Sequence, residues 1–227
     1  MTVRVIPGEI SATDATVRSV IPTSIQPKWP PLERVAETIA TPRRRFPAHG
    51  HSGAEVLTYI VEGSGLYSYG NQPVEPVASG SIHLLTAPSG VAHAINPGKG
   101  QTLRWLAVLV TLPPSSDSTV RLQSSQALDG AVGADGTRVR ALVGPGSPIR
   151  STAGLEVYDL SFVEDGTTFR KVGHTVRAVA YALAGAGSVD GRPVEVGEAA
   201  LVEDASGVAI QGRAGFRLAL VQVPRPS

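Results

Sequence analysis

The sequence predicts an all-β chain that folds as two copies of an antiparallel barrel or jelly roll. Short runs of Val, Ile, Leu and Tyr alternate with turn residues, and the 227 residues include 25 Gly and 18 Pro. Short strands at this spacing are typical of barrels and jelly rolls. The second half of the chain also repeats the first, which indicates two copies of one supersecondary unit.

The expected strands can be placed in chain order. An irregular, proline-rich arm over residues 1–31 holds one short strand at Thr2–Ile6, and Val35–Thr41 is either a strand or one helical turn. The other strands of the first half are apolar runs bounded by turn residues: Val56–Val61, Leu66–Tyr69, Ile82–Leu85 and Leu103–Leu112. Those of the second half have the same character: Val139–Val143, Leu155–Val163, Arg177–Leu183, Ala199–Val202 and Phe216–Val223.

A Ser-, Asp- and Gly-rich stretch separates the two halves. It contains PPSSDS and DGAVGADG, a composition typical of linkers. We therefore expect an N-terminal domain over residues 1–113, a linker over 114–137 and a C-terminal domain over 138–227.

The composition excludes several classes of function. Twenty Lys and Arg oppose nineteen Asp and Glu, so no electrostatic grip on nucleic acid or on a membrane surface is indicated. No run of eighteen apolar residues and no signal peptide is visible, and we expect a cytoplasmic protein. The absence of cysteine rules out disulfides and thiolate ligands. Neither a phosphate-binding loop nor a nucleophile elbow is present.

Four of the five histidines lie between Phe46 and Asn96. In an extended segment, residues two apart point to the same face, so His49 and His51 can aim two imidazoles at one point. A third imidazole, that of His93, follows about forty residues later. Three convergent imidazoles with an open position form a typical catalytic metal site.

The internal repeat predicts that only the first copy holds this site. VASGSIHLLTAPSGVAH (77–93) aligns without a gap on VEVGEAALVEDASGVAI (194–210), which places Ile210 at the position of His93. Aligning the glycine that ends the first long strand places Lys171, Gly173 and Arg177 at the positions of His49, His51 and Glu55. His174 is one residue out of phase with these positions, and we expect it in a loop or on the surface.

The motif HGHSGAEVLTYIVEG resembles the first motif of the pirin branch of the cupins, H-x-H-x3-E-x7-G. The spacing of Gly80, Gly90 and His93 is similar to the pirin form of the second motif. The resemblance covers about residues 43–190. It implies a bicupin with two stacked cupin jelly-roll barrels, one divalent metal ion in the N-terminal barrel, and a degenerate C-terminal barrel.

The resemblance also leaves the fourth ligand open. Pirins use three histidines and a glutamate two residues after the third, but that position is Ile95 here. Glu55 is one candidate fourth ligand, as in cupins with three histidines and one glutamate. Alternatively, water completes a three-histidine site, or Glu55 acts as a general base beside the metal. Ser52 and Gly53 allow a bulge that would change the face on which Glu55 lies.

Three functions follow from this resemblance. The first is a quercetinase-like dioxygenase that uses iron, with Mn, Ni, Cu and Zn as alternatives, to oxidise a small aromatic or enol substrate with dioxygen. The second is a non-catalytic metal- or metabolite-binding protein, or a regulatory one. The third is a metal-independent isomerase or cyclase. The sequence indicates no contact with nucleic acid and does not define an oligomeric state.

Overall fold

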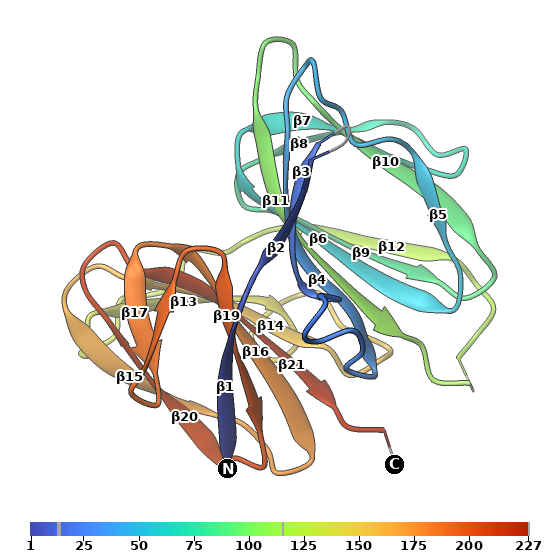
Figure 1. Ribbon diagram of the computed structural model, residues 1–227. Helices are drawn as coiled ribbons and strands as arrows, with labels where there is room; N and C mark the ends of the chain where they lie inside the picture. The colour runs from blue at the N-terminus through green and yellow to red at the C-terminus, as the bar shows by residue number, and fades with distance from the viewer. Residues whose placement is uncertain (13–14, 115, 227) are drawn as a thin grey trace. The chain divides into compact units, whose positions relative to one another are not determined.

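The computed structural model describes residues 1–12, 15–114 and 116–226, and it confirms the all-β prediction. The described residues form strands and connecting loops without any helix, so no helix in this part of the chain could cross a membrane. The chain divides into two compact units (Figure 1). The N-terminal unit comprises residues 9–127, and the C-terminal unit comprises residues 1–8 and 128–227.

The N-terminal unit consists of two antiparallel sheets. The larger sheet has the strand order β12–β9–β6–β11–β4–β3–β2, and the smaller sheet has the order β5–β10–β7–β8. The strands of the larger sheet are β2 (Glu9–Ala12), β3 (Thr16–Ile21), β4 (Leu32–Ala40), β6 (Ala54–Glu62), β9 (Ser81–Ala87), β11 (Leu103–Thr111) and β12 (Arg121–Gln126). Those of the smaller sheet are β5 (His49–His51), β7 (Ser64–Tyr69), β8 (Glu75–Ala78) and β10 (Val91–Pro97).

The C-terminal unit repeats this arrangement. Its larger sheet has the order β1–β19–β16–β21–β14–β13, and its smaller sheet has the order β15–β20–β17–β18. The strands of the larger sheet are β1 (Thr2–Pro7), β13 (Thr137–Val143), β14 (Glu156–Phe162), β16 (Val176–Ala184), β19 (Glu198–Glu203) and β21 (Arg217–Pro224). Those of the smaller sheet are β15 (Gly166–Lys171), β17 (Ala186–Val189), β18 (Arg192–Glu195) and β20 (Gly207–Gly212).

Comparison of the two units shows which strands correspond. Position by position, β9–β6–β11–β4–β3 in one large sheet matches β19–β16–β21–β14–β13 in the other, and the two small sheets match throughout. The edge position beside β9 is occupied by β12, and the matching position beside β19 is occupied by β1. The large sheet of the N-terminal unit has one further strand, β2, beyond β3.

The units differ from the expected domain boundaries at two places. Residues 1–8 belong to the C-terminal unit because Thr2–Pro7 pairs with β19 over its whole length. The expected linker, residues 114–137, contains β12, which pairs with β9 in the N-terminal unit. Each unit is a sandwich of two separate sheets, so the expected barrels are jelly rolls that do not close.

The core of the N-terminal unit lies between its two sheets. The larger sheet contributes Ala40, Ile60, Leu103 and Trp105, and the smaller sheet contributes Tyr67, Val77 and Ile95. Burial of such apolar surface stabilises the unit by about 25 cal/mol per Å². Because successive residues of a strand point to opposite faces of the sheet, every second side chain of these strands points into the interior.

Glycine is required where β6 turns into β7. Gly63 has φ +88°, and a Cβ there would lie 2.0 Å from the carbonyl oxygen of Thr102. Gly185, at the matching turn between β16 and β17, also has a positive φ of +67°. Glycine adopts this conformation without the steric cost that a side chain brings. The sequence repeat at these two glycines therefore reflects one shared turn.

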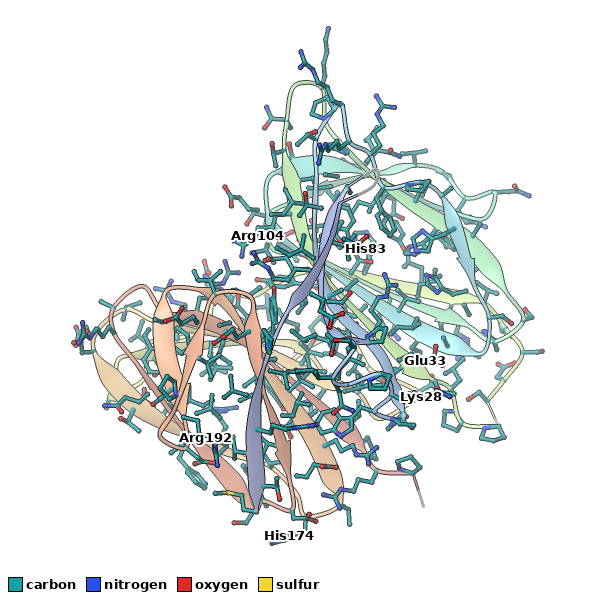
Figure 2. The ribbon with its side chains drawn as sticks, in the orientation of Figure 1. Lys28, Glu33, His83, Arg104, His174 and Arg192 are labelled. Carbon is teal, nitrogen blue, oxygen red and sulfur yellow. The ribbon has the colours of Figure 1, made fainter. Side chains whose placement is uncertain are left out.

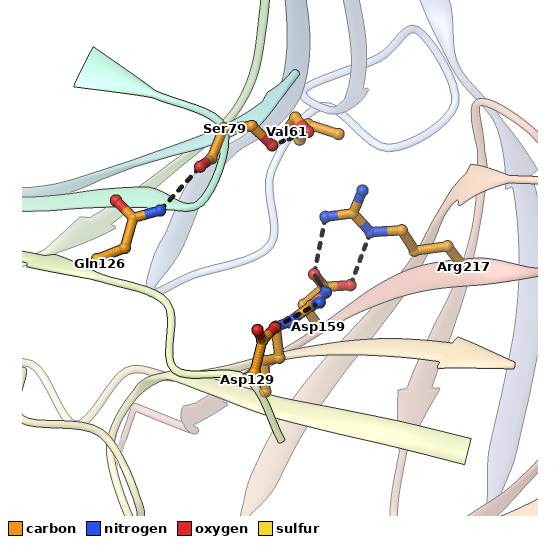
Figure 3. A network of polar contacts seen from close by, with 7 residues as sticks. Val61, Ser79, Gln126, Asp129, Asp159 and Arg217 are labelled. Carbon is orange, nitrogen blue, oxygen red and sulfur yellow. Dashed lines mark hydrogen bonds and ion pairs between the residues drawn. The ribbon is translucent and has the colours of Figure 1, made fainter. Parts of the chain in front are cut away.

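A buried ion pair ties together the large sheet of the C-terminal unit (Figure 3). Asp159 on β14 is fully buried, and its two carboxylate oxygens accept bonds of 2.9 and 2.8 Å from Nε and Nη2 of Arg217 on β21. Arg140 on β13 lies 3.5 Å from the same carboxylate and donates a second bond, of 3.0 Å, to Asp129. These contacts link three neighbouring strands through one carboxylate.

Candidate metal centre

The pairing of β5 with β10 brings the three predicted histidines together. In this register His49 lies opposite His93, and His51 lies opposite Val91. His49 and His51 are two residues apart on one strand and therefore share a face. One nitrogen from each of the three imidazoles lies within 4.8 Å of the others, so the structure gathers the set that the sequence proposed.

The geometry of the three rings suits a bound ion. Nε2 of His49 lies 3.3 Å from Nε2 of His93. Bonds of ~2.0–2.1 Å from two imidazoles to one ion place the ligand nitrogens about 3.0–3.4 Å apart. Nε2 of His51 is buried and has no hydrogen-bond partner in the described part of the chain. An unpaired buried nitrogen is costly, and a metal ion at this point would satisfy it.

The second nitrogens of two rings are held by neighbouring groups. Nδ1 of His49 donates to the carbonyl oxygen of Pro47 at 3.0 Å, because a carbonyl oxygen can only accept. This bond leaves the lone pair on Nε2 free to bind a metal. Nδ1 of His93 lies 3.1 Å from the hydroxyl oxygen of Tyr67. Such outer contacts fix the tautomer and the orientation of metal-binding imidazoles.

Burial keeps the imidazoles of His51 and His93 neutral. It lowers the pKa of His93 to about 3, and the neighbouring His49 and His51 add to the shift. The pKa of His51 is also lowered, first by burial and then by His49 and Arg34, while Glu33 opposes the shift. Because only the neutral imidazole binds a metal, both residues are in the ligating form at neutral pH.

Tyr67 is itself held by neighbours inside the N-terminal unit. Burial, with smaller contributions from Tyr69 and Glu75, raises the pKa of its phenol, which therefore stays protonated. Its ring stacks on His83 with centroids 4.4 Å apart and an interplanar angle of 24°. Nε2 of His83 lies 3.4 Å from Glu75 (Figure 2 marks His83). His83 therefore packs in the wall of the N-terminal unit and supports Tyr67.

The structure does not bring Glu55 to the three histidines. Val56 and Thr58 line the pocket beside the imidazoles, so Glu55 lies on the opposite face of β6. Its carboxylate is buried and accepts a bond of 3.0 Å from the Thr86 hydroxyl on β9. The shared parity of His49, His51 and Glu55 ends at Gly53, which has φ +67°. The expected roles of Glu55 as ligand or base are therefore not supported by its position.

The histidines line an apolar pocket of about 320 Å³. Phe46 and Trp105 form an edge-to-face pair there, with ring centroids 5.9 Å apart. Ile95 shares the face of His93, is 2% exposed and fills the position at which pirins carry a carboxylate. The remaining lining residues are Arg34, Thr38, Val56, Thr58, Ala107, Val108 and Leu109. The pocket thus offers nitrogen ligands and apolar walls but no carboxylate among the described residues that line it.

The C-terminal unit has lost the ligand set. Strand pairing places Thr168, Arg170 and Ile210 at the positions of the three histidines. The first two differ from the Lys171 and Gly173 expected from the sequence repeat, although neither pair could complete the site. Ile210 is fully buried in an apolar core cluster. His174 is exposed in a turn at the periphery of this unit, as expected (Figure 2).

Sequence reasoning missed the roles of two pocket neighbours. Alternation of Tyr67 and Tyr69 on one strand indicates a core or rim residue, or one that lines the pocket, but it does not indicate a contact with His93. No sequence pattern points to Arg34. The contact of Tyr67 with His93 depends on the pairing of β7 with β10, in which Ile95 lies opposite Tyr67 and His93 lies opposite Tyr69. No local motif encodes this register.

Comparison with known proteins finds a family model that matches the segment containing the three histidines. The Pirin family model matches residues 14–108. This segment of the chain is similar to the Pirin family. The matched segment contains all three metal-site histidines, so the resemblance expected from the HGH motif is confirmed. No curated protein sequence matches the chain.

Several solved structures match nearly the whole chain in fold. A protein of Geobacillus kaustophilus is 21% identical with a TM-score of 0.86, and the match covers 98% of this chain and 95% of that one. Quercetin 2,3-dioxygenase from Acinetobacter baumannii is 18% identical with a TM-score of 0.85, covering 98% and 79%. The Escherichia coli pirin YhhW in complex with nickel(II) is 14% identical with a TM-score of 0.82, covering 99% and 100%. These likenesses confirm the bicupin fold.

Proposed function

We propose that the N-terminal unit binds one divalent transition-metal ion through His49, His51 and His93, and that it oxidises a small aromatic or enol substrate with dioxygen. The observation that carries the proposal is the buried Nε2 of His51, which has no partner among the described residues and belongs to the three-histidine cluster. A core histidine without a ligand would normally find a hydrogen-bond partner.

The donor set indicates which ions to test. Neutral imidazoles suit Fe, Ni, Cu and Zn, whereas Mg and Ca prefer oxygen ligands. Three protein ligands leave coordination positions open, as in catalytic sites. Fe(II) is our first candidate, with Mn, Ni, Cu and Zn as alternatives. The nickel in YhhW and the oxygenase activity in the name of the Acinetobacter protein are consistent with this class of site.

Each part of the pocket contributes to the proposed reaction. When bound, the ion supplies a charge that stabilises an enolate or phenolate and a point at which substrate and dioxygen meet. Phe46 and Trp105 present aromatic surfaces against which a flat ring can pack. Ile95 and Val56 keep water from the reacting atoms, and Tyr67 holds the ring of His93 in place. In the proposed reaction a carbon–carbon double bond of the substrate breaks and each of its two carbons gains one oxygen atom of dioxygen, so the substrate supplies all the electrons and no other reductant is needed.

Metal content provides the first test. The protein is prepared anaerobically with Fe(II), Mn(II) or Ni(II), and metal per chain is measured by mass spectrometry. We expect about one ion per chain for the wild type and for His174→Ala, which removes an exposed histidine outside the site. His51→Ala should lose the ion. Less than about a tenth of an ion per wild-type chain would refute the proposal.

Oxygen consumption separates catalysis from binding. We expect the metal-loaded protein to take up dioxygen with quercetin or a smaller enol, and His51→Ala to abolish this uptake. One observation favours a second, non-catalytic function: Ile95 replaces the carboxylate that pirins use, so metal would be retained without turnover. Full metal occupancy without oxygen uptake would support that function. Turnover that survives a chelator would instead indicate a metal-independent isomerase or cyclase.

A further inference from the structure

Arg34 stands out among the residues that line the metal-site pocket. It lies on β4 opposite Leu109 of β11, and it is half-buried. No hydrogen bond or ion pair engages its side chain within the described part of the chain. Arg104, also in this unit, shows the usual alternative, since its guanidinium is bonded to the buried carboxylate of Glu37 at 2.6 Å. Arg34 therefore presents an uncompensated cation to the pocket.

The described residues around Arg34 in the pocket provide no negative charge to balance it. Alternation on β4 turns Arg34 and Thr38 to the same face, and both line the pocket. His49, His51 and His93 line the same pocket as Arg34. No Asp or Glu is among the described lining residues. A bound divalent ion would add further positive charge, so the missing element is an anion.

The shape of the Arg34 guanidinium indicates which kind of anion would bind. Its planar array of donors matches a carboxylate with two parallel bonds, a stronger and more directional contact than a point charge makes. The rest of the lining is apolar or aromatic, apart from the hydroxyls of Thr38 and Thr58 and the three imidazoles. At about 320 Å³ the pocket is at the lower end of the ~300–1,000 Å³ range of ligand sites.

We propose that this pocket takes a small, flat, unsaturated carboxylic acid, whose carboxylate pairs with Arg34 while its unsaturated body packs against Trp105 and Phe46. This proposal specifies the substrate class of the proposed function, and it rests on that function for the claim that the bound acid is the substrate. Recognition of the carboxylate by Arg34 does not itself require metal. Binding can therefore be measured on protein treated with a chelator, apart from any activity.

The experiment compares an acid with its uncharged counterpart. Binding of trans-cinnamate and of cinnamamide is measured by titration calorimetry and by quenching of tryptophan fluorescence, with and without metal. We expect cinnamate to bind at least about tenfold more tightly than cinnamamide to the wild type. Arg34→Gln should weaken cinnamate binding about 10- to 100-fold and abolish the discrimination, since a bond to a charged group is worth ~1.5–3 kcal/mol.

Two further variants control for fold and charge. Arg34→Lys retains the charge but lacks the paired donors, and should give an intermediate affinity. Arg192→Gln removes an exposed arginine of the C-terminal unit, and should leave both affinities unchanged (Figure 2). Equal binding of acid and amide, no cinnamate binding by the wild type, or full cinnamate binding by Arg34→Gln would each overturn the assignment. Loss of metal binding alone would refute only the proposed function.

Discussion

The hydroxyl oxygen of Tyr67 lies 3.1 Å from Nδ1 of His93, on the side of the ring away from the nitrogen that faces His49. When His93 binds a metal through Nε2, its proton is on Nδ1 and is donated to this hydroxyl. Tyr67 thus acts as a positioning residue for the site. It connects the histidine-bearing edge of the small sheet to the stacked ring of His83.

Tyr67→Phe should weaken metal binding about 10- to 100-fold, because the outer hydrogen bond that fixes the His93 ring is lost. The phenyl ring preserves the stack on His83, so the fold should persist. Metal affinity is measured by competition with a chelator of known strength. Tyr158→Phe is the matched control, since it removes a hydroxyl bonded to Glu156 in the C-terminal unit. Equal affinities of the two variants would contradict a positioning role.

Ile95→Glu should make stability depend on metal. The new carboxylate would lie on the face of His93 in a buried position, and without metal it should cost about 2–3 kcal/mol of unfolding free energy. Added Fe(II) or Ni(II) should recover much of this loss through a fourth ligand. Thermal unfolding with and without metal measures both effects. Ile210→Glu, which buries a carboxylate away from any histidine cluster, should be destabilised without rescue.

Glu55→Gln should leave the metal content unchanged. The residue points away from the histidines, and an amide oxygen can still accept the bond from Thr86. Metal per chain is measured beside the wild type, with circular dichroism as a check on folding. A folded Glu55→Gln protein that has lost its metal would place the carboxylate in the site and contradict the structure.

Asp159→Asn should destabilise the C-terminal unit without affecting metal binding. The carboxylate is fully buried and holds Arg217 with two bonds, and breaking such a pair costs about 3 kcal/mol. Denaturant unfolding measures the loss. Asp129→Asn removes a carboxylate that is 86% exposed and bonded to Arg140, and should have little effect. A similar loss for both variants would show that burial does not set the strength of this network.

The three histidines could be predicted because their positions follow from local rules. Residues two apart share a face in any strand, and the spacing of Gly80, Gly90 and His93 resembles the second motif of pirins. The fate of Glu55 could not be predicted in the same way. Alternation predicts which face a side chain lies on only while the strand is continuous. The strand is interrupted after His51 by Ser52 and Gly53, and Gly53 has a positive φ.

The alignment of the two copies was wrong at one loop, because the loop is longer in the second copy. Ala54 follows His51 by three positions, whereas Val176 follows the corresponding Arg170 by six. An ungapped alignment therefore slides by three residues at this loop. Several strands were also missed because they are not apolar. RLQSSQ, the β12 segment, has a mostly exposed or half-buried pattern and pairs on one side only, with β9. Such a strand depends on its partner and not on its own composition.

The position of β1 makes the C-terminal unit dependent on the first residues of the chain. The strand that begins the chain completes the second copy, and the strand that precedes the second copy completes the first. A ribosome therefore releases residues 2–7 long before β19 exists to receive them. Severing the chain near residue 128 would leave β12 beside β9 in the N-terminal fragment but would separate β19 from β1, so the C-terminal unit is not a self-sufficient contiguous module.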